Sequence, residues 1–525
     1  MYWTLLPEEI MAEIIGETSG ETAWKTIMET GGYNKDRLED EYESTFYESQ
    51  YIYEQLKKYG LPGANITRFP GGTVWDGIEG ELWEVNPSRQ KMASYLDNTA
   101  MLVRGSRNAD VKTELIWVGQ GQKKDLDGLD VKGKIVVTEG GVSQSRPAFD
   151  PLQIPWSGIR NRGNDETVSG FAFYLPFREG LFLKQRLLRG EKITVEARVR
   201  AEERPYTLQC PECFIPGTDP EAEENIFSAH LFEGYVKQGA NDNKSGSAAI
   251  LEIARTLHRL IESGRIPRPR RTIRFLWGPE FSGTGPWVKA NRDLMDKTLC
   301  NINLDMVGEW LSLNQAHFCL MRTTGNGSIV RGPVSLTAIP GESSLPSVRT
   351  NPSSTALKPI TERRIMRCSM TGGVQVPGVM MIAWPDQWYH TSGDRVNKAD
   401  PTQLKRAAVI GAAAGLGVEP VEIVWSEEEL DAQKIIPVPT SQVREKGYRG
   451  YREYLDAVPE DVQKKYDYRR GNIAGTSELQ CLINGENSIL DIKLMLDSQF
   501  EKESVLKDIL HYMELLKAAG LITYK

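Results

Sequence analysis

This chain of 525 residues contains few cysteines and few histidines, and no apolar run approaches the length of a membrane span. Crossing a bilayer takes roughly 20 consecutive apolar residues, so a membrane-spanning protein is excluded. The amino terminus has no basic segment followed by a long apolar one, so we expect no signal peptide. The compartment stays open between a cytoplasmic protein and the mature form of an exported one.

The six cysteines are too few for a disulfide scaffold. Cys210 and Cys213 form one CxxC pair, whereas a zinc ribbon requires a second such pair, which the chain lacks. We interpret this pair as a local disulfide or two free thiols, with a metal or redox role as the alternative.

An excess of basic charge is also missing. The formal net charge is −8 and the pI is near 5.5. A nucleic-acid-binding protein usually shows a basic footprint, so we expect no nucleic-acid partner. The chain is too long for a single core, which suggests about three domains. A homo-oligomer is compatible with the sequence, and no feature of the chain decides the point.

The pattern of apolar residues predicts four segments. Residues 1–94, of which the first 90 look mostly helical, form the first part of an α/β domain. Residues 95–222 form a small β-rich insert, with strand-like runs TELIWVG, GKIVVTEGG, SGFAFYLPF and KITVEARV and one amphipathic helix, GLFLKQRLLRG. Residues 223–420 continue the α/β domain, and residues 421–525 hold a linker and a tail.

Within 223–420 the pattern alternates strand, helix, strand. SGSAAILEIARTLHRLIESG predicts a helix that buries one face, whose members are Ile250, Ile253, Ala254, Leu257 and Ile261. RTIRFLW, which breaks at Gly278-Pro279, and LCNINLD, which ends in Asp305, predict strands. We therefore predict an α/β fold with a mixed central sheet flanked by helices. Functional residues of such sheets gather beyond the carboxyl ends of the strands.

The tail reads as helix, turn, helix and short strand, a winged-helix-like pattern. Residues 481–525 contain 5 Lys and no Arg against 7 Asp and Glu, a net charge of −2. Such a surface repels phosphates rather than neutralising them. We expect a structural or protein-contact role for this tail.

Five residues of metal-binding or acid–base type stand at the ends of these predicted elements. They are His230, Asp242, Glu280, Asp305 and His390. Histidine and aspartate bind divalent metals, and a spare glutamate can take a proton from an activated water. With five histidines in the whole chain, we predict that His230 and His390 are ligands. The structural alternatives are a core histidine, helix-starting or turn aspartates, and a solvated loop glutamate.

These motifs have a recognisable order: H-x11-D within a stretch ending G-A-x-D-N-x-S-G, then W-G-x-E, then N-L-D-M-V-G, then Y-H-T-x-x-D. They resemble the zinc aminopeptidase family, which includes leucyl-type aminopeptidases, glutamate carboxypeptidase and the transferrin receptor. The likeness covers about 225–420. The insert, with GLDVKGKIVV, looks like the protease-associated domain of many members.

The resemblance implies a role for each of the five residues. His230 and Asp305 match ligands of one zinc ion, and Asp242 matches the carboxylate that bridges two ions. His390 matches a ligand of the other ion. Glu280 matches the general base.

Two positions depart from the family pattern. The family usually has Glu-Glu where this chain has Glu280-Phe281, and the second Glu is a metal ligand. It also usually has His-x-Asp, with the Asp orienting the histidine, where this chain has Phe232. Without the second glutamate, one ion keeps only Asp242 and His390, short of the three protein ligands usual for catalytic zinc.

A single zinc held by His230, Asp242 and Asp305 is therefore favoured. His390 then completes the same site or contacts substrate. A second ion remains the alternative, with Glu309 or Asp386 as the missing ligand.

The resemblance implies a metal-dependent hydrolase, an aminopeptidase or related exopeptidase that acts on a peptide or amide substrate. The alternatives are a non-peptidase amide hydrolase or cyclase on the same scaffold, and a catalytically degenerate binding or scaffold protein.

Overall fold

The computed structural model describes most of the chain. The described residues are 6–33, 37–140, 149–159, 170–232, 239–280, 284–322, 357–359, 376, 378–417, 426–441, 443, 458–465, 473, 479–480, 482–485, 487–500 and 504–525. They form two compact units, a larger one within residues 1–323 and 336–418 and a smaller one that includes residues 419–525. Each unit is described by itself.

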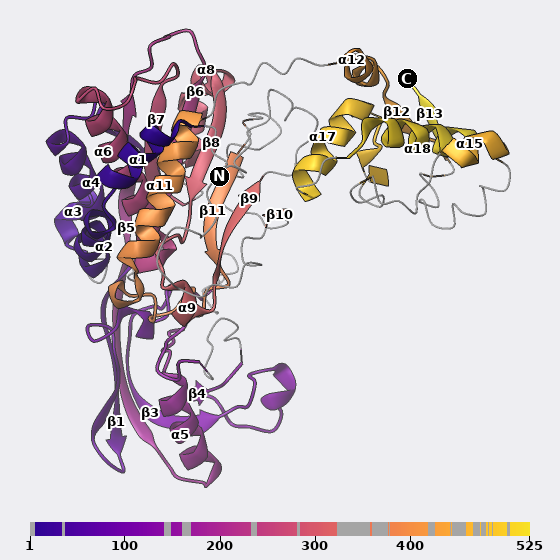
Figure 1. Cartoon of the computed structure of the whole chain (residues 1–525). Coiled ribbons are helices and arrows are strands. Elements are labelled where there is room, and N and C mark those ends of the chain that lie inside the picture. The colour runs from indigo at the N-terminus through magenta and orange to yellow at the C-terminus, as the bar shows by residue number, and fades with distance from the viewer. Residues whose placement is uncertain are drawn as a thin grey trace. The chain divides into compact units, whose positions relative to one another are not determined.

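A mixed sheet organises the larger unit (Figure 1). Its strand order is β10-β9-β11-β8-β6-β7-β5-β1-β2. Neighbouring pairs among β11, β8, β6 and β7 are parallel, whereas β9, β5 and β1 join antiparallel to β11, β7 and β5 respectively. The strands span β1 Asn65–Asn86, β2 Gln90–Ser94, β5 Thr194–Ile215, β6 Glu224–Phe232, β7 Ile273–Pro279, β8 Thr298–Leu304, β9 His317–Arg322, β10 Leu357–Pro359 and β11 Gly378–Trp384.

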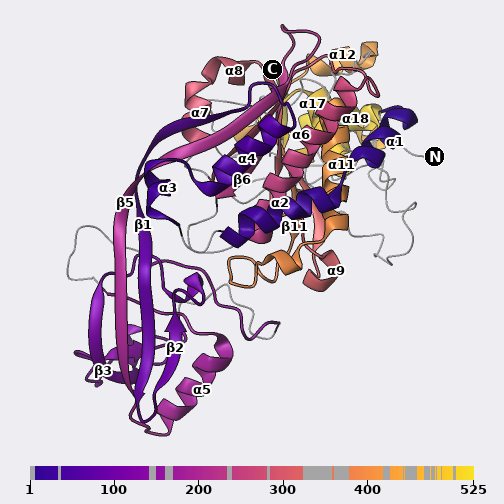
Figure 2. The same cartoon turned by 90° about the vertical axis from the view of Figure 1, so that its left-hand side faces the viewer.

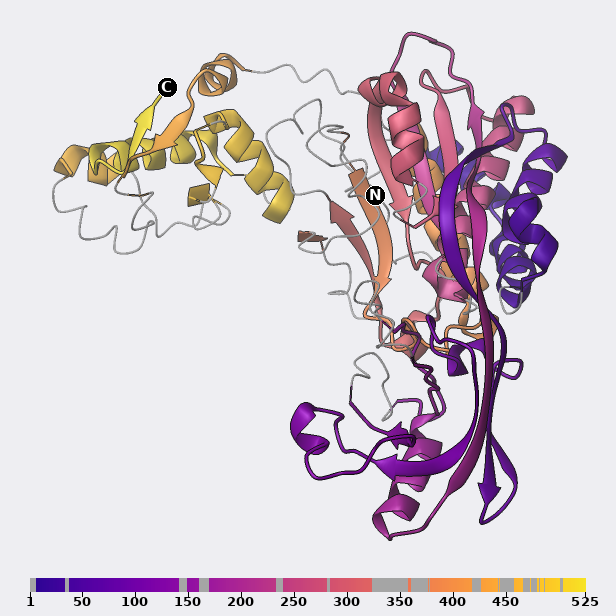
Figure 3. The same cartoon turned by 180° about the vertical axis from the view of Figure 1, so that it is seen from behind.

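Helices cover both faces of this sheet, which confirms the predicted α/β class (Figures 1 and 3). One face carries α1 Glu8–Glu17, α4 Tyr47–Lys58, α6 Gly246–Glu262 and α11 Pro401–Gly417, and α7 Thr284–Ala290 with α8 Arg292–Asp296 lies on the other. Alternate residues of β6 explain this arrangement, because Phe227, Ala229 and Leu231 join the first core and Ile226 joins the second. The predicted apolar face of α6 is fully buried.

Among the described residues outside the insert, three further α-helices belong to the larger unit. They are α2 Gly20–Tyr33, α3 Glu39–Glu43 and α9 Leu311–Asn314. Helix α2 packs against the start of α6 and α11 through Ala23 and Ile27.

The expectation of a mostly helical first 90 residues is wrong beyond Lys58. Residues 65–86 form the 22-residue strand β1, which pairs along its length with β5. Glycines and a proline in NITRFPGGTVWDGIEGELWEVN interrupt the alternation typical of a strand. Its partner lies more than a hundred residues later in the chain, so the pairing that stabilises β1 is not visible locally.

The two long strands β1 and β5 continue from the central sheet into the insert (Figure 2). There they meet β3 Ala109–Trp117, β4 Ile135–Val137 and α5 Phe177–Leu188 around a separate small core. The runs in β3, β4 and β5 and the amphipathic helix agree with the expected elements. SGFAFYLPF is not a strand, since only Phe173 makes an isolated bridge, with Leu102. The boundaries at 94 and 222 stay predictions.

Cys210 and Cys213 are buried free thiols on β5, so the disulfide alternative is excluded. Burial raises the pKa of the Cys210 thiol to about 12, and it also raises the pKa of the Cys213 thiol. Neither thiol is therefore a ready nucleophile or metal ligand at neutral pH.

The smaller unit has its own apolar core. Its described elements are α12 Glu427–Gln433, β12 Pro437–Pro439, α15 Glu460–Lys465, α17 Ile489–Phe500, α18 Leu506–Ala518 and β13 Ile522–Tyr524. The expected helix, turn, helix and strand correspond to α17, α18 and β13. The expected linker at 421–450 instead contains α12 and β12, and β12 pairs antiparallel with β13. Within the described residues, no helix has the length and apolar character of a membrane span.

Phe227→Ala is expected to lower the free energy of unfolding of the larger unit by about 3–5 kcal/mol. The Phe227 ring is fully buried and stacks on Phe275 with 5.3 Å between ring centroids. Urea denaturation measures the change. The matched control is Phe182→Ala, whose side chain is 61% exposed and should cost no more than about 0.5 kcal/mol. Equal losses in both variants would contradict this core.

Candidate metal centre

The carboxyl ends of the parallel strands place three of the predicted site residues at one edge of the sheet. His230 lies near the end of β6, Glu280 directly follows β7, and Asp305 directly follows β8. Asp242 lies in the connection from β6 to α6, and His390 follows β11. Residues that are far apart in the sequence therefore meet at the position where α/β sheets carry their functional groups.

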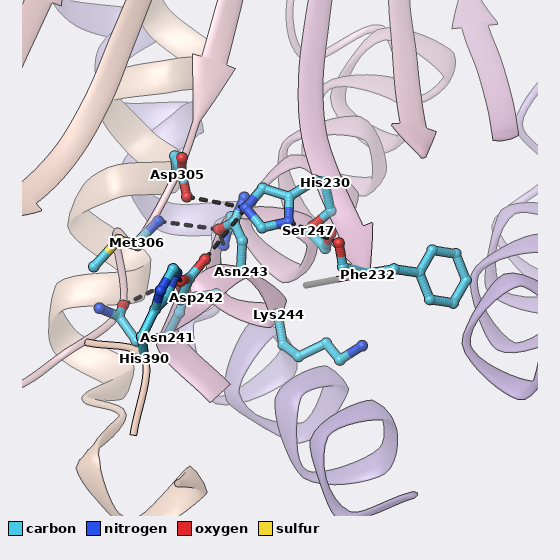
Figure 4. A network of polar contacts seen from close by, with 12 residues as sticks. His230, Phe232, Asn241, Asp242, Asn243, Lys244, Ser247, Asp305, Met306 and His390 are labelled. Atoms are coloured by element: carbon cyan, nitrogen blue, oxygen red, sulfur yellow. Dashed lines mark hydrogen bonds and ion pairs between the residues drawn. The ribbon is translucent and has the colours of Figure 1, made fainter. Parts of the chain in front are cut away.

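Four of these side chains cluster around the carboxylate of Asp242 (Figure 4). His230 Nε2 lies 3.3 Å from Asp242 Oδ1 and 3.4 Å from Asp305 Oδ1. His390 Nε2 lies 3.3 Å from the other Asp242 oxygen, Oδ2. Asp242 thus directs one oxygen toward each histidine.

The spacing of these atoms fits a zinc ligand shell. Tetrahedral zinc with bonds of about 2.1 Å separates neighbouring ligand atoms by about 3.4 Å. His230, Asp242 and Asp305 form a buried group whose ligand atoms all lie within 4.8 Å of one another, the one group of three or more found among the described residues. Imidazole nitrogen and carboxylate oxygen are ordinary zinc donors, so the residues fit this metal. Their roles as ligands stay predictions.

His230 has a second hydrogen-bond partner, although Phe232 stands where the family usually carries the aspartate that orients this histidine. His230 Nδ1 lies 3.1 Å from the main-chain oxygen of Phe232, and a carbonyl oxygen can only accept a hydrogen bond. Nδ1 therefore carries a proton and directs Nε2 at the carboxylates. The Phe232 ring turns away from the cluster and packs on Phe46, 5.5 Å between centroids.

The connection of residues 239–247, which we call the site loop, is bound to the end of β6. Lys244 Nζ donates to the Leu231 carbonyl oxygen at 2.7 Å, and Ser247 Oγ donates to the His230 carbonyl oxygen at 3.0 Å. These bonds fix the distance between the main chains that carry His230 and Asp242.

The site loop is also bound to the end of β8 through Asn243. Its Nδ2 donates to the Leu304 carbonyl oxygen at 2.9 Å, and its Oδ1 accepts from the Met306 main-chain nitrogen at 3.0 Å. Asp305 lies between these two residues, so one amide side chain holds its main chain on both sides.

Asp394 binds the same loop from the segment that carries His390. Its carboxylate accepts from the main-chain nitrogens of Asn241, at 2.6 Å, and Asp242, at 3.0 Å. Asp394 therefore holds the main chain of the site loop through both oxygens of its carboxylate.

Glu309 and Asp386, the candidates for a missing ligand, form a separate buried pair beside the cluster. Asn314 Nδ2 donates to both carboxyls, 3.2 Å from Asp386 Oδ1, and Asn241 Nδ2 lies 3.2 Å from Asp386 Oδ2. Burial raises the pKa of Asp386 to about 6, and burial together with Asp386 raises that of Glu309. Neither joins the three-residue group among the described residues.

Glu280 is partly exposed, and its charge acts on His230. Burial by itself lowers the pKa of His230, but the charges of Asp305, Asp242 and Glu280 outweigh burial and raise this pKa well above 6.5. Phe281, whose side chain has no ligand atom, lies outside the described residues.

The aromatic residues near His390 divide between core and surface. Trp388 and Tyr389 are buried, whereas Trp384 is 38% exposed and contacts Tyr389 edge-on. Trp384 is therefore the one of these three that is open to solvent.

Sequence reasoning missed Asn243, Lys244 and Ser247, the residues that hold the site loop. Asn243 and Lys244 lie inside the quoted motif G-A-x-D-N-x-S-G and Ser247 directly follows it, so the run of polar residues around Asp242 was the available signal.

The fold and the site together define a metallopeptidase-like α/β domain with a histidine and carboxylate cluster at the edge of its sheet. Residues 214–414 match Peptidase family M28. This match covers the part of the chain that holds all five predicted site residues. No curated protein sequence matches the chain.

Solved structures resemble it in fold. A protein of Clostridium acetobutylicum, described provisionally as a peptidase, is 15% identical with a TM-score of 0.54, over 99% of each chain. The Peptidase M28 precursor of Shewanella amazonensis SB2B is 14% identical with a TM-score of 0.54, over 79% of this chain and 97% of its own. A zinc aminopeptidase of Bacillus subtilis is 19% identical with a TM-score of 0.51, over 76% of this chain and 94% of its own.

Asp394→Asn is expected to weaken zinc affinity by about 10–100-fold, because an amide cannot accept from both main-chain nitrogens of the site loop. Competition with a chromophoric chelator measures the affinity. Asp400→Asn is the matched control, since Asp400 accepts from Thr402 at the start of α11. A zinc affinity equal to wild type in Asp394→Asn would contradict this function of Asp394.

Zinc binding at pH 7 is expected to release about one proton from His230. Because the pKa of His230 is raised in the metal-free protein, the ion must displace the Nε2 proton. Below that pKa, zinc affinity should fall about tenfold for each pH unit lowered. Titration calorimetry in buffers of different ionisation enthalpy counts the protons. If His230→Asn releases as many protons on zinc binding as the wild-type chain, the released proton does not come from His230.

Proposed function

We propose that this chain is a zinc-dependent aminopeptidase or related exopeptidase that hydrolyses peptide or amide bonds. The observation that carries the proposal is the grouping of His230, Asp242 and Asp305, with His390 against the second oxygen of Asp242. Membership of residues 214–414 in Peptidase family M28 supports it.

One tightly held zinc ion is the arrangement that the described residues favour. His230 Nε2, Asp242 Oδ1 and Asp305 Oδ1 supply the three protein ligands that a catalytic zinc usually has. A second ion at the other oxygen of Asp242 would have only Asp242 and His390 as ligands from the predicted set. Two protein ligands are too few to hold an ion tightly. We assign His390 to the open side of the first site, where it closes the ligand shell or contacts substrate.

A zinc ion bound here supplies an acidified water and a polarised substrate carbonyl. Glu280 takes the proton from the attacking water and later delivers it to the leaving amine. Its place directly after β7 keeps the carboxylate at the strand end, while partial exposure leaves it accessible to substrate. Phe232 O and the Nδ1 proton hold the His230 ring in position throughout.

A non-peptidase amide hydrolase or cyclase is the second candidate. Phe281 favours it, because a site with one ion is compatible with such chemistry. A degenerate binding protein is less consistent with four converging ligand-type residues and Glu280 together.

Glu280→Gln is expected to keep bound zinc and to reduce turnover of amino-acid anilides by at least about 100-fold, since general base catalysis contributes about 10²–10⁴-fold. Metal content per chain and hydrolysis of an anilide panel are measured together. Glu224→Gln is the control, because Glu224 pairs with Arg274 at the amino end of β6.

Turnover near the wild-type rate in Glu280→Gln would remove Glu280 from this role. A zinc-loaded wild-type chain that cleaves none of the anilides but cleaves or cyclises other amides would favour the second candidate. A chain that binds no zinc would favour the degenerate protein.

A further inference from the structure

A segment of the insert, residues 149–159, lies against the segment that carries His390. Trp156 donates its main-chain N–H to the His390 carbonyl oxygen at 2.6 Å. Ser392 N donates to the Ile154 carbonyl oxygen at 2.8 Å, and Ile154 N donates to Ser392 Oγ at 2.9 Å. The two stretches thus pair like short antiparallel strands, although Ile154 and Ser392 are 238 residues apart.

The His390 ring lies between two aromatic rings of different origin. Tyr389, its neighbour in the chain, stacks on it with 3.8 Å between centroids and 21° between planes. Trp156 of the insert meets it edge-on at 5.6 Å and 82°. A second aromatic contact, Phe149 with Trp388 at 5.1 Å, joins the same two segments. These rings restrict rotation of the imidazole about its side-chain bonds.

His390 also has a main-chain conformation that needs support from its surroundings. Its φ is +53°, in the left-handed region that side-chain-bearing residues seldom occupy. Such a conformation persists where neighbouring structure fixes it. The hydrogen bond from Trp156 N to the His390 carbonyl oxygen supplies one such constraint.

We propose that Trp156 is a positioning residue for His390, so that the insert completes the metal centre. Trp156 holds the His390 main chain by its N–H and the imidazole by its ring, which directs Nε2 toward Asp242 Oδ2 at 3.3 Å. The inference rests on the proposed function in assigning His390 to the metal centre. It goes further in making the geometry of that centre depend on a segment outside the family-matched residues 214–414.

Simple packing between two parts of one unit is the competing explanation. Packing predicts that loss of the Trp156 ring lowers the unfolding temperature and leaves the bound metal unchanged. Positioning predicts a change in the metal itself. Cobalt(II) reports this directly, because its visible absorption depends on the number and geometry of its ligands.

The experiment compares cobalt affinity, cobalt spectrum and metal-free unfolding temperature in the full chain and in three variants, Trp156→Ala, Trp156→Phe and Phe182→Ala. Trp156→Ala should weaken cobalt binding by about 10–100-fold and alter the visible bands. Trp156→Phe, which keeps an aromatic ring, should recover most of the affinity. Phe182→Ala removes an exposed ring elsewhere in the insert and should match wild type.

Wild-type affinity and spectrum in Trp156→Ala would overturn the inference. If Trp156→Ala does not fold, Ser392→Ala decides, since it removes the acceptor of Ile154 N without touching the insert core. Weaker cobalt binding in Ser392→Ala supports the inference, and unchanged binding overturns it. If the wild-type chain binds no cobalt, both this inference and the proposed function are contradicted. If it binds cobalt but hydrolyses no substrate, only the proposed function is contradicted.

Discussion

The hydrogen bonds of the site loop, residues 239–247, are the constraint on which the candidate metal centre depends. Lys244 and Ser247 bind the end of β6, Asn243 binds both sides of Asp305, and Asp394 holds the main chain of Asp242 from the His390 segment. Buried polar groups are costly unless they are paired, so a fully connected network of this kind is rigid. The atoms of the neighbouring histidines and aspartates lie 3.3–3.4 Å apart in this network. Pre-arranged carboxylates favour a cation because repulsion between them is relieved when it binds.

The two departures from the family pattern have different consequences. At Phe232 the side chain is lost as a partner but the main-chain oxygen of the same residue takes its place, so orientation of His230 is kept. At position 281 the phenylalanine side chain offers no ligand atom. The first change is therefore compatible with an ordered His230, whereas the second is the reason for proposing a single zinc ion. The insert adds a constraint of its own through its contact with the His390 segment.

Much of the fold and site could be predicted from the sequence because the signals were local. The apolar period of α6, the runs that became β7 and β8, and the five chemical residues at element ends are readable in short windows. The strand β1 was not, because its partner β5 lies far along the chain and its glycines hide the alternation. The contact of Trp156 with His390 and the carbonyl of Phe232 were also hidden, since main-chain partners and long-range packing leave no residue-type signature. The roles of the five site residues and the domain boundaries stay predictions.

A crystal structure of the zinc-loaded chain, with the metal located by its anomalous scattering, tests the central claim most directly. We expect one strong peak about 2.0–2.2 Å from His230 Nε2, Asp242 Oδ1 and Asp305 Oδ1. His390 should contact the same ion or lie beside its open position. Zinc bound elsewhere, or no peak between these side chains at saturating zinc, would contradict the account.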